Sequence, residues 1–408
     1  MQFPARSPLV ARLTENAMQR TPPHLGTLVL LTALPVLTLN MFLPSLPAMT
    51  VALGTDEAGL ALAVSGYMIF SAVLQLVIGP VSDRIGRRPV ALAALLLYAG
   101  ASLGAALAQS AGVFIAFRLA QAAIVAGTVM SAAIIRDLYP PSEAAGRMGA
   151  VSASMALAPM LGPTIGGILD TYIGWRAVFG LYAALGGAGL LIAFLDLGET
   201  KQVGGRKLRL ADYGALLAAP RYWAFALCQA FSLGAFFVFV SGVPFVAHAL
   251  WDLSPAWIGA GIGSITGGYM LGSAVTARMA PRLGIHRLIV AGRVIPSVAL
   301  SVALVLFLLG AASPYLMFGA TIFVGIGNGL TVANANTGAL SVRPDLAGTA
   351  ASLGGALAIA LGALLSWLTL AALAVSASPV VLLGILLAAV LISLAAGLVA
   401  VSLDRAVL

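Results

Sequence analysis

The sequence predicts an all-α membrane protein in which twelve transmembrane helices form two pseudo-symmetric six-helix bundles. Three observations carry this prediction: the composition, the number of long apolar runs and an internal repeat. Of the 408 residues, 61% are hydrophobic and 8% are charged, and the mean hydropathy is +1.06. Ordinary soluble domains carry about 25% charged residues, so this chain is expected to lie in a lipid bilayer.

Twelve apolar runs are long enough to cross a bilayer, because a helix needs about 20 such residues to span the hydrocarbon core. The runs are apolar on every face and do not alternate with period two, which favours helices over the strands of a β-barrel. They cover residues 25–49, 58–80, 89–109, 111–136, 144–169, 175–196, 220–249, 255–277, 288–310, 313–340, 346–373 and 379–402.

An internal repeat divides these spans into two halves. Residues 66–73 read GYMIFSAV and residues 268–275 read GYMLGSAV, while RIG at 84–86 is echoed by RLG at 282–284. Parallel repeats of this kind place a binding site near the membrane midplane, between two halves that rock against each other. The predicted division is a segment 1–24, a bundle 25–196, a linker 197–219, a second bundle 220–402 and a tail 403–408.

The basic residues set the orientation, because cytoplasmic loops retain Lys and Arg. With both termini inside, 19 of the 21 basic residues lie at the cytoplasmic face, Arg293 among them; Arg176 faces out and Arg118 falls within the fourth span. The formal charge of +8 is therefore spread over short loops and does not indicate a nucleic-acid partner. No cleavable signal peptide is expected, and the lone Cys228 excludes an intramolecular disulfide framework.

A short basic segment, GPVSDRIGRRP at residues 79–89, separates the second span from the third. Its length forces two helices into a tight antiparallel pair on the cytoplasmic side. Gly79 and Gly86 would allow close helix approach and a tight turn. Asp83 can pair with a nearby arginine and face a helix N-terminus.

This segment resembles the loop 2-3 motif of the major facilitator superfamily, and within it the drug/proton antiporters of the twelve-span Bcr/CflA type; the resemblance covers residues 25–402. It implies a bacterial inner-membrane transporter with a cytoplasmic latch that breaks during transport. The latch residues would be Gly79, Asp83, Arg84, Gly86, Arg87 and Arg88, with Asp137 as a partner. The alternative is that the arginines only set the topology.

The fifth span carries a second resemblance, to the Gly-Pro-x-x-Gly-Gly signature of exporters in this superfamily. Residues 158–167 read APMLGPTIGG, in which Ala158 replaces the usual leading glycine and the signature residues are Gly162, Pro163, Gly166 and Gly167. Proline kinks the helix and the glycines permit close packing. Generic membrane packing is the alternative interpretation.

Arg118 lies within a span, where an arginine costs several kcal/mol unless it is paired or hydrated. Residues 118–121 read RLAQ and resemble the Arg-x-x-Gln motif of the fourth span, although Ala122 stands where glycine is usual. The family assigns this arginine to proton coupling or to the substrate cavity. A structural arginine bonded to carbonyls and Gln121 is the alternative.

The expected acidic partner of Arg118 is missing, since all 13 acids map to loops, termini or helix ends. Asn40 stands where relatives carry an acid, and His24, His248 and His286 lie near span ends and are poor replacements. Asparagine resembles a protonated aspartate but cannot release a proton. Two hypotheses follow: an engineered Asp-to-Asn variant at position 40, which the buried unpaired arginine favours, or a natural relative with altered coupling.

Aromatic, methionine and amide side chains from both halves are expected to line a cavity for loosely fitted amphipathic drugs. The candidates are Asn40, Met41, Tyr67, Gln75, Arg118, Gln121 and Met155 in the first half, and Phe231, Phe236, Phe237, Phe239, Tyr269, Asn328, Asn334 and Asn336 in the second. For the phenylalanines from 236 to 239, contact with lipid or core is an equal alternative.

No metal-ligand spacing, nucleotide-binding loop or nucleophile motif is present, so an enzyme is not expected. We expect a monomer in the bilayer that needs no cofactor or metal and uses the proton gradient to export a small drug, such as a chloramphenicol-like, bicyclomycin-like or cationic compound. An uptake carrier for a small metabolite is the alternative within the same fold. A receptor or channel is the alternative from another class.

Overall fold

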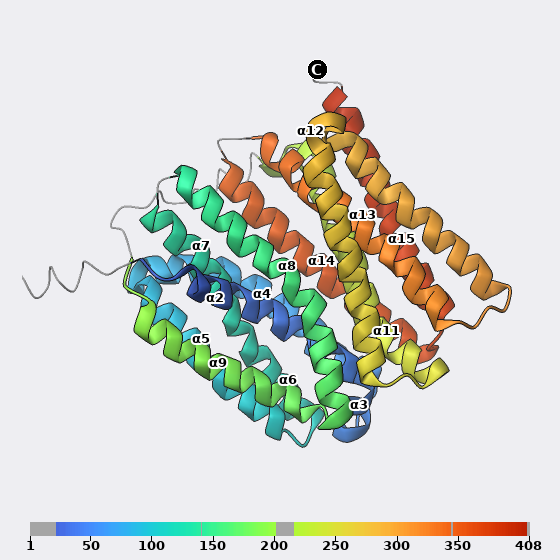
Figure 1. The fold of residues 1–408 in the computed structure, drawn as a ribbon, viewed down its shortest axis with the longest axis horizontal. Helices are drawn as coiled ribbons and strands as arrows, with labels where there is room; N and C mark the ends of the chain where they lie inside the picture. The colour runs from blue at the N-terminus through green and yellow to red at the C-terminus, as the bar shows by residue number, and fades with distance from the viewer. Residues whose placement is uncertain (1–21, 140, 201–215, 344–345, 406–408) are drawn as a thin grey trace, which may run out of the picture.

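The computed structural model describes residues 22–139, 141–200, 216–343 and 346–405, and every regular element in these ranges is a helix (Figure 1). The helices of the N-terminal half are α2 (Leu25–Asn40), η1 (Leu43–Ser45), α3 (Leu46–Leu53), α4 (Glu57–Ile85), α5 (Arg87–Leu107), α6 (Ala111–Gln121), η2 (Ala122–Val125), α7 (Ala126–Leu138), α8 (Pro141–Tyr172) and α9 (Arg176–Asp196). Those of the C-terminal half are α11 (Pro220–Trp251), α12 (Pro255–Leu308), α13 (Pro314–Ser341), α14 (Ala347–Val375) and α15 (Pro379–Arg405).

These helices account for the twelve predicted spans. Ten helical stretches of the described residues are long and apolar enough to cross a membrane. One of them, α12, holds both the eighth and the ninth span, because its backbone leaves the helical region at Gly284 (φ 74°, ψ 162°). The fifth span is α8, which completes the set.

The first span is broken between α2 and α3. The helix α2 ends at Asn40, and the 3-10 turn η1 follows with Pro44 near its start. A helix end leaves its last carbonyl groups without intrahelical donors. The break therefore exposes the carbonyls of the last turn of α2 inside the bundle, where other helices can supply donors.

The eleven-residue break expected at 79–89 is much shorter in the structure. The helix α4 continues to Ile85 and α5 begins at Arg87, so Gly86 alone separates them. Its φ of 110° suits glycine, and the repeat glycine Gly284 likewise has a positive φ. The close-packing role expected of Gly79 is wrong, since an added Cβ there would meet nothing within 4 Å.

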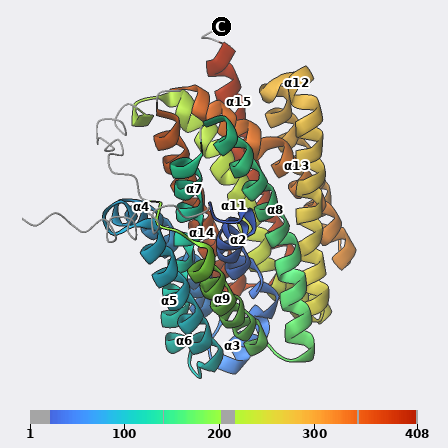
Figure 2. The same cartoon turned by 60° about the vertical axis from the view of Figure 1, so that its left-hand side comes forward.

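The two halves meet tightly at the end of the molecule opposite the turn at Gly86. We call the side that carries residues 79–89 the loop face and the opposite side the far face. The helices α8 and α12 lie side by side near the far face and diverge toward the loop face (Figures 1 and 2). Near the far face the Thr164 hydroxyl donates to the Gly259 carbonyl at 3.3 Å, and the Ala256 N–H donates to Thr171 Oγ1 at 3.1 Å. This α8–α12 contact is called the far-face seam below.

Candidate functional site

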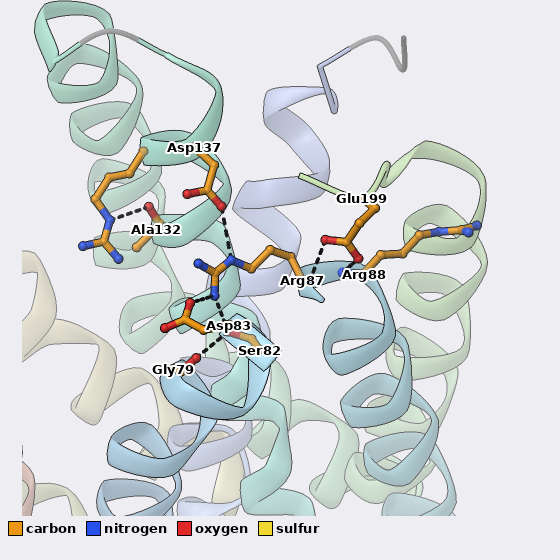
Figure 3. Close-up of polar contacts among 9 residues, drawn as sticks. Gly79, Ser82, Asp83, Arg87, Arg88, Ala132, Asp137 and Glu199 are labelled. Carbon is orange, nitrogen blue, oxygen red and sulfur yellow. Dashed lines mark hydrogen bonds and ion pairs between the residues drawn. The ribbon is translucent and has the colours of Figure 1, made fainter. Parts of the chain in front are cut away.

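An arginine at the start of α5 joins two acids at the loop face (Figure 3). Arg87 Nη1 lies 2.6 Å from Asp83 Oδ1 on α4, and Arg87 Nε lies 3.1 Å from Asp137 Oδ2 on α7. The arginine side chain is 12% exposed and that of Asp83 63% exposed. The expected partnership of Asp83 and Asp137 is therefore made through Arg87, while Arg84 lies exposed at the end of α4.

Glu199 is a further member of this cluster, although the sequence predicts only that it lies outside the spans. Its Oε1 accepts from the Arg87 N–H at 2.9 Å and its Oε2 from the Arg88 N–H at 3.3 Å (Figure 3). A carboxylate at a helix N-terminus satisfies unpaired donors and complements the helix dipole. A Cβ at Gly86 would collide with this carboxylate. The position of Glu199 therefore depends on the absence of a side chain at Gly86.

The C-terminal half has a corresponding cluster at its own end of the chain. Asp404 on α15 lies 2.5 Å from His286 Nε2, just past the turn at Gly284, and it also pairs with Arg221 at the start of α11. In both halves an acid near the end of the last helix therefore anchors the residues that follow the repeated turn glycine.

Arg118 is fully buried in the N-terminal bundle and uses all three of its guanidinium nitrogens. Nη2 donates to the Thr38 carbonyl at 2.7 Å, Nε to the Ala63 carbonyl at 3.1 Å and Nη1 to Gln121 Oε1 at 2.9 Å. The amide of Gln121 in turn donates to Ser102 Oγ at 2.7 Å. These are the partners of the structural alternative considered above, and no acid is among them.

The end of α2 explains how this charge is accommodated. Thr38 lies in the last turn of α2, where the carbonyl end of the helix dipole favours a cation. The guanidinium carbon also lies 4.2 Å from the ring centroids of Phe42 and Tyr67, and such cation–π contacts stabilise a desolvated charge. A broken helix and two rings thus replace the missing carboxylate.

Asn40, two residues past Thr38, is buried but is not hydrogen-bonded to Arg118. Its Nδ2 donates to the Val36 carbonyl at 2.8 Å, while its Oδ1 is buried without a hydrogen-bond partner. The side chain is therefore held by its donor group, which is the group that an ionised aspartate lacks.

A second buried arginine, Arg293, is a correction to the predicted topology. The positive-inside rule predicts that it lies at the cytoplasmic face, but it is 0% exposed within the C-terminal bundle. Its Nε donates to Thr331 Oγ1 and its Nη2 to Asn328 Oδ1, both at 2.9 Å. Arg293 lies inside the ninth apolar run, and this position already indicates a buried arginine. The positive-inside rule, applied to a residue so near the end of a span, gives the wrong location.

The predicted cavity residues are distributed between these two centres and their surroundings. Tyr67 and Gln121 contact Arg118, and Asn328 contacts Arg293. The side chain of Met155 lies outside the described residues. Of the others, Met41, Phe239 and Asn334 are buried, and Gln75, Phe231, Phe236, Phe237, Tyr269 and Asn336 are half-buried.

The Gly-Pro segment of α8 forms backbone contacts with both halves. A Cβ at Gly166 would collide with the Met41 carbonyl, and one at Gly167 with the Pro255 carbonyl across the far-face seam. On the other side of the seam, Gly259 abuts the carbonyl of Pro163. The close backbone approach expected of the signature is therefore present at Gly166 and Gly167, whereas a Cβ at Gly162 would make only ordinary contacts.

Comparison with known proteins gives a consistent result. Residues 28–366 match the Major Facilitator Superfamily. A "Chloramphenicol resistance protein" from Pseudomonas aeruginosa is 35% identical over 216 residues, which are 51% of this chain and only half of that protein. A "Bicyclomycin resistance protein homolog" from Haemophilus influenzae is 26% identical over 86% of this chain and 89% of its own length. A solved inward-facing, occupied bacterial homolog of the human lysosomal transporter Spinster shares the fold, with a TM-score of 0.74, 17% identity and 98% of each chain covered.

Proposed function

The chain belongs to the major facilitator superfamily of transporters, and we propose that it exports small amphipathic drugs by alternating access, with an exchange for protons that requires an acid at position 40. The relatives named for chloramphenicol and bicyclomycin resistance support this choice of substrate. We place the protein in the bacterial inner membrane, with the loop face and both termini in the cytoplasm. Its partners there are the drug, protons and lipid.

The observation that carries the proposal is the far-face seam. The α8 segment that resembles the exporter signature packs backbone against backbone on α12, around Gly167 and Gly259. Glycines at the contact let the two backbones approach closely, so the helices can separate and close again without repacking large side chains. The seam is thus the gate that opens outward, while the Asp83–Arg87–Asp137 bridge controls the loop face.

Position 40 is the proton-coupling position in this proposal. A protonated aspartate could donate to the Val36 carbonyl as Asn40 Nδ2 does at 2.8 Å, whereas an ionised one would lose that bond and face the carbonyl oxygen with negative charge. In this proposal the chain with Asn40 mimics the proton-loaded carrier, and the closed far-face seam belongs to that state.

A disulfide across the far-face seam tests the gate. Thr171→Cys with Ala256→Cys, in an Asn40→Asp, Cys228→Ala background, places two thiols beside the contact between Thr171 Oγ1 and the Ala256 N–H. The chain would be reconstituted with labelled chloramphenicol and an imposed pH gradient. We expect oxidation to stop export and reduction to restore it, while the parent with only Asn40→Asp and Cys228→Ala is insensitive to both. Full export by the cross-linked protein, or a net import of drug, would contradict the proposal.

A further inference from the structure

The two buried arginines differ in how completely their charge is compensated. Arg118 has a partner for each nitrogen and two ring faces. Arg293 is as deeply buried, but its Nη1 has no hydrogen-bond partner. We propose that Arg293 anchors a second substrate subsite, in the C-terminal bundle, which binds the carboxylate of an amphipathic organic anion.

The groups around Arg293 are neutral in the part of the chain that the structure describes. Asn328 and Thr331 on α13 accept from the guanidinium, and the Ser232 hydroxyl on α11 donates to the same Asn328 oxygen at 2.9 Å. No ion pair between Arg293 and an acid occurs among the described residues. A buried charge without a counter-ion is costly. An anionic ligand would supply the negative charge that Arg293 lacks.

The packing of α12 on α13 holds this guanidinium in place. A Cβ at Gly292 would lie 2.7 Å from the Gly327 carbonyl, so the two backbones touch beside the arginine. With Nε and Nη2 fixed to α13, the free Nη1 is a preorganised donor. A guanidinium presents donors in a planar fork that suits a carboxylate.

Arg293 is fully buried, so a ligand can reach it only when the bundle opens toward one face. Arg293 lies two helical turns beyond His286, which marks the loop face in this half, and two turns correspond to about 10 Å along a helix. The far-face seam is closed, so a ligand would reach this arginine from the loop face. That is the entry side required of an exporter, and the inference rests on the proposed function in this respect.

For the apolar part of the ligand, the candidate contacts are three phenylalanines of α11. Phe231 precedes Ser232 in the chain, and it is half-buried together with Phe236 and Phe237 one to two turns further along. Aromatic side chains of this kind bind ring systems without fixed hydrogen bonds. The ligand class is therefore an aromatic carboxylate, in which the charge binds Arg293 and the ring contacts these phenylalanines.

Asn328→Asp tests the subsite while preserving its packing. The new carboxylate would occupy the place of the amide that already accepts from Arg293 Nη2, and it would neutralise the guanidinium from within. We would measure binding of carboxyfluorescein to the purified full chain by fluorescence polarisation, together with its export from proteoliposomes. We expect a loss of affinity of about tenfold or more, with an unchanged or higher melting temperature. Gln109→Glu, in the exposed turn between α5 and α6, adds the same charge elsewhere and should bind as the parent does.

Two results would overturn the inference. One is carboxyfluorescein binding by Asn328→Asp at parental affinity, and the other is no binding by the parent chain. Export of chloramphenicol and ethidium, measured in parallel, separates this from the proposed function. If both are exported while carboxyfluorescein does not bind, the subsite alone is wrong. If carboxyfluorescein binding depends on Asn328 but nothing is exported, the subsite stands and the export proposal fails.

Discussion

The N-terminal and C-terminal bundles each bury one arginine, and they compensate its charge by different means. Arg118 is held by backbone carbonyls, among them one at the broken end of α2, by an amide oxygen and by two aromatic faces. Arg293 is held by one amide and one hydroxyl, and one of its nitrogens is left over. Burial alone therefore does not distinguish a structural arginine from a ligand-binding one. The number of hydrogen-bond and ring partners around each guanidinium group does.

Replacing each arginine by methionine should change the stability by different amounts. Arg118→Met removes three hydrogen bonds and two ring contacts, and we expect a loss of about 3 kcal/mol. Arg293→Met removes an incompletely compensated charge, so its cost should be below about 1 kcal/mol, or stability should rise. Thermal unfolding in detergent, followed by tryptophan fluorescence, would compare the two. Equal losses would show that the two sites are compensated alike.

The sequence alone predicts the helices and the two halves, but not the partners of the two buried arginines. Apolar runs and the GYM repeat predict the helices and the two halves, because membrane spanning imposes length and composition directly. The environment of Arg118 depends on the break after Asn40, which brings Thr38 and Phe42 to a residue some eighty positions away. Such a meeting of segments has no local sequence signal.

The clusters at the loop face show the same limit. Asp83 and the turn glycine are visible as a motif, but Glu199 reaches the motif only through the packing of α9 on α5. Arg293 was misplaced because a rule about loops was applied to a residue near a span end. Long-range packing decides which charged residues near a helix end point inward.

The repeated turn glycines offer a matched pair. Both Gly86 and Gly284 have a positive φ, but only at Gly86 would a Cβ collide, with the Glu199 carboxylate. Gly86→Ala should therefore cost about 2 kcal/mol, from backbone strain and the displaced cap, and Gly284→Ala about 1 kcal/mol from strain alone. Melting temperatures of the two variants would test the difference. A larger loss at Gly284 would contradict the role assigned to Glu199.

The anchoring acids are expected to have smaller effects. Glu199→Gln weakens two charge-assisted bonds to the start of α5, and Asp404→Asn weakens the contacts to Arg221 and His286. Each should cost about 1 kcal/mol, because both clusters are partly exposed. Hydrogen exchange would locate the loss, which we expect at the start of α5 for Glu199→Gln and at the start of α11 for Asp404→Asn. Exchange that rises equally in both halves would argue against separate anchors.

Gly79→Ala should have the smallest effect of the series. An added methyl group meets nothing within 4 Å, and alanine is favoured over glycine inside a helix by up to about 1 kcal/mol. In the other half, Ala277 stands at the same distance before the turn glycine Gly284. We expect an unchanged or slightly higher melting temperature and unchanged export. A clear loss of export would show that Gly79 contacts a partner helix in another state of the transport cycle.

The most direct measurement is drug-driven proton release from the purified chain, compared with the Asn40→Asp variant. The variant restores a group that can give up a proton at the site where Asn40 now donates to the Val36 carbonyl. Our account predicts that chloramphenicol releases protons from the Asn40→Asp variant and not from the chain with Asn40. Proton release of the same size from both forms would place the coupling elsewhere and contradict the role assigned to position 40.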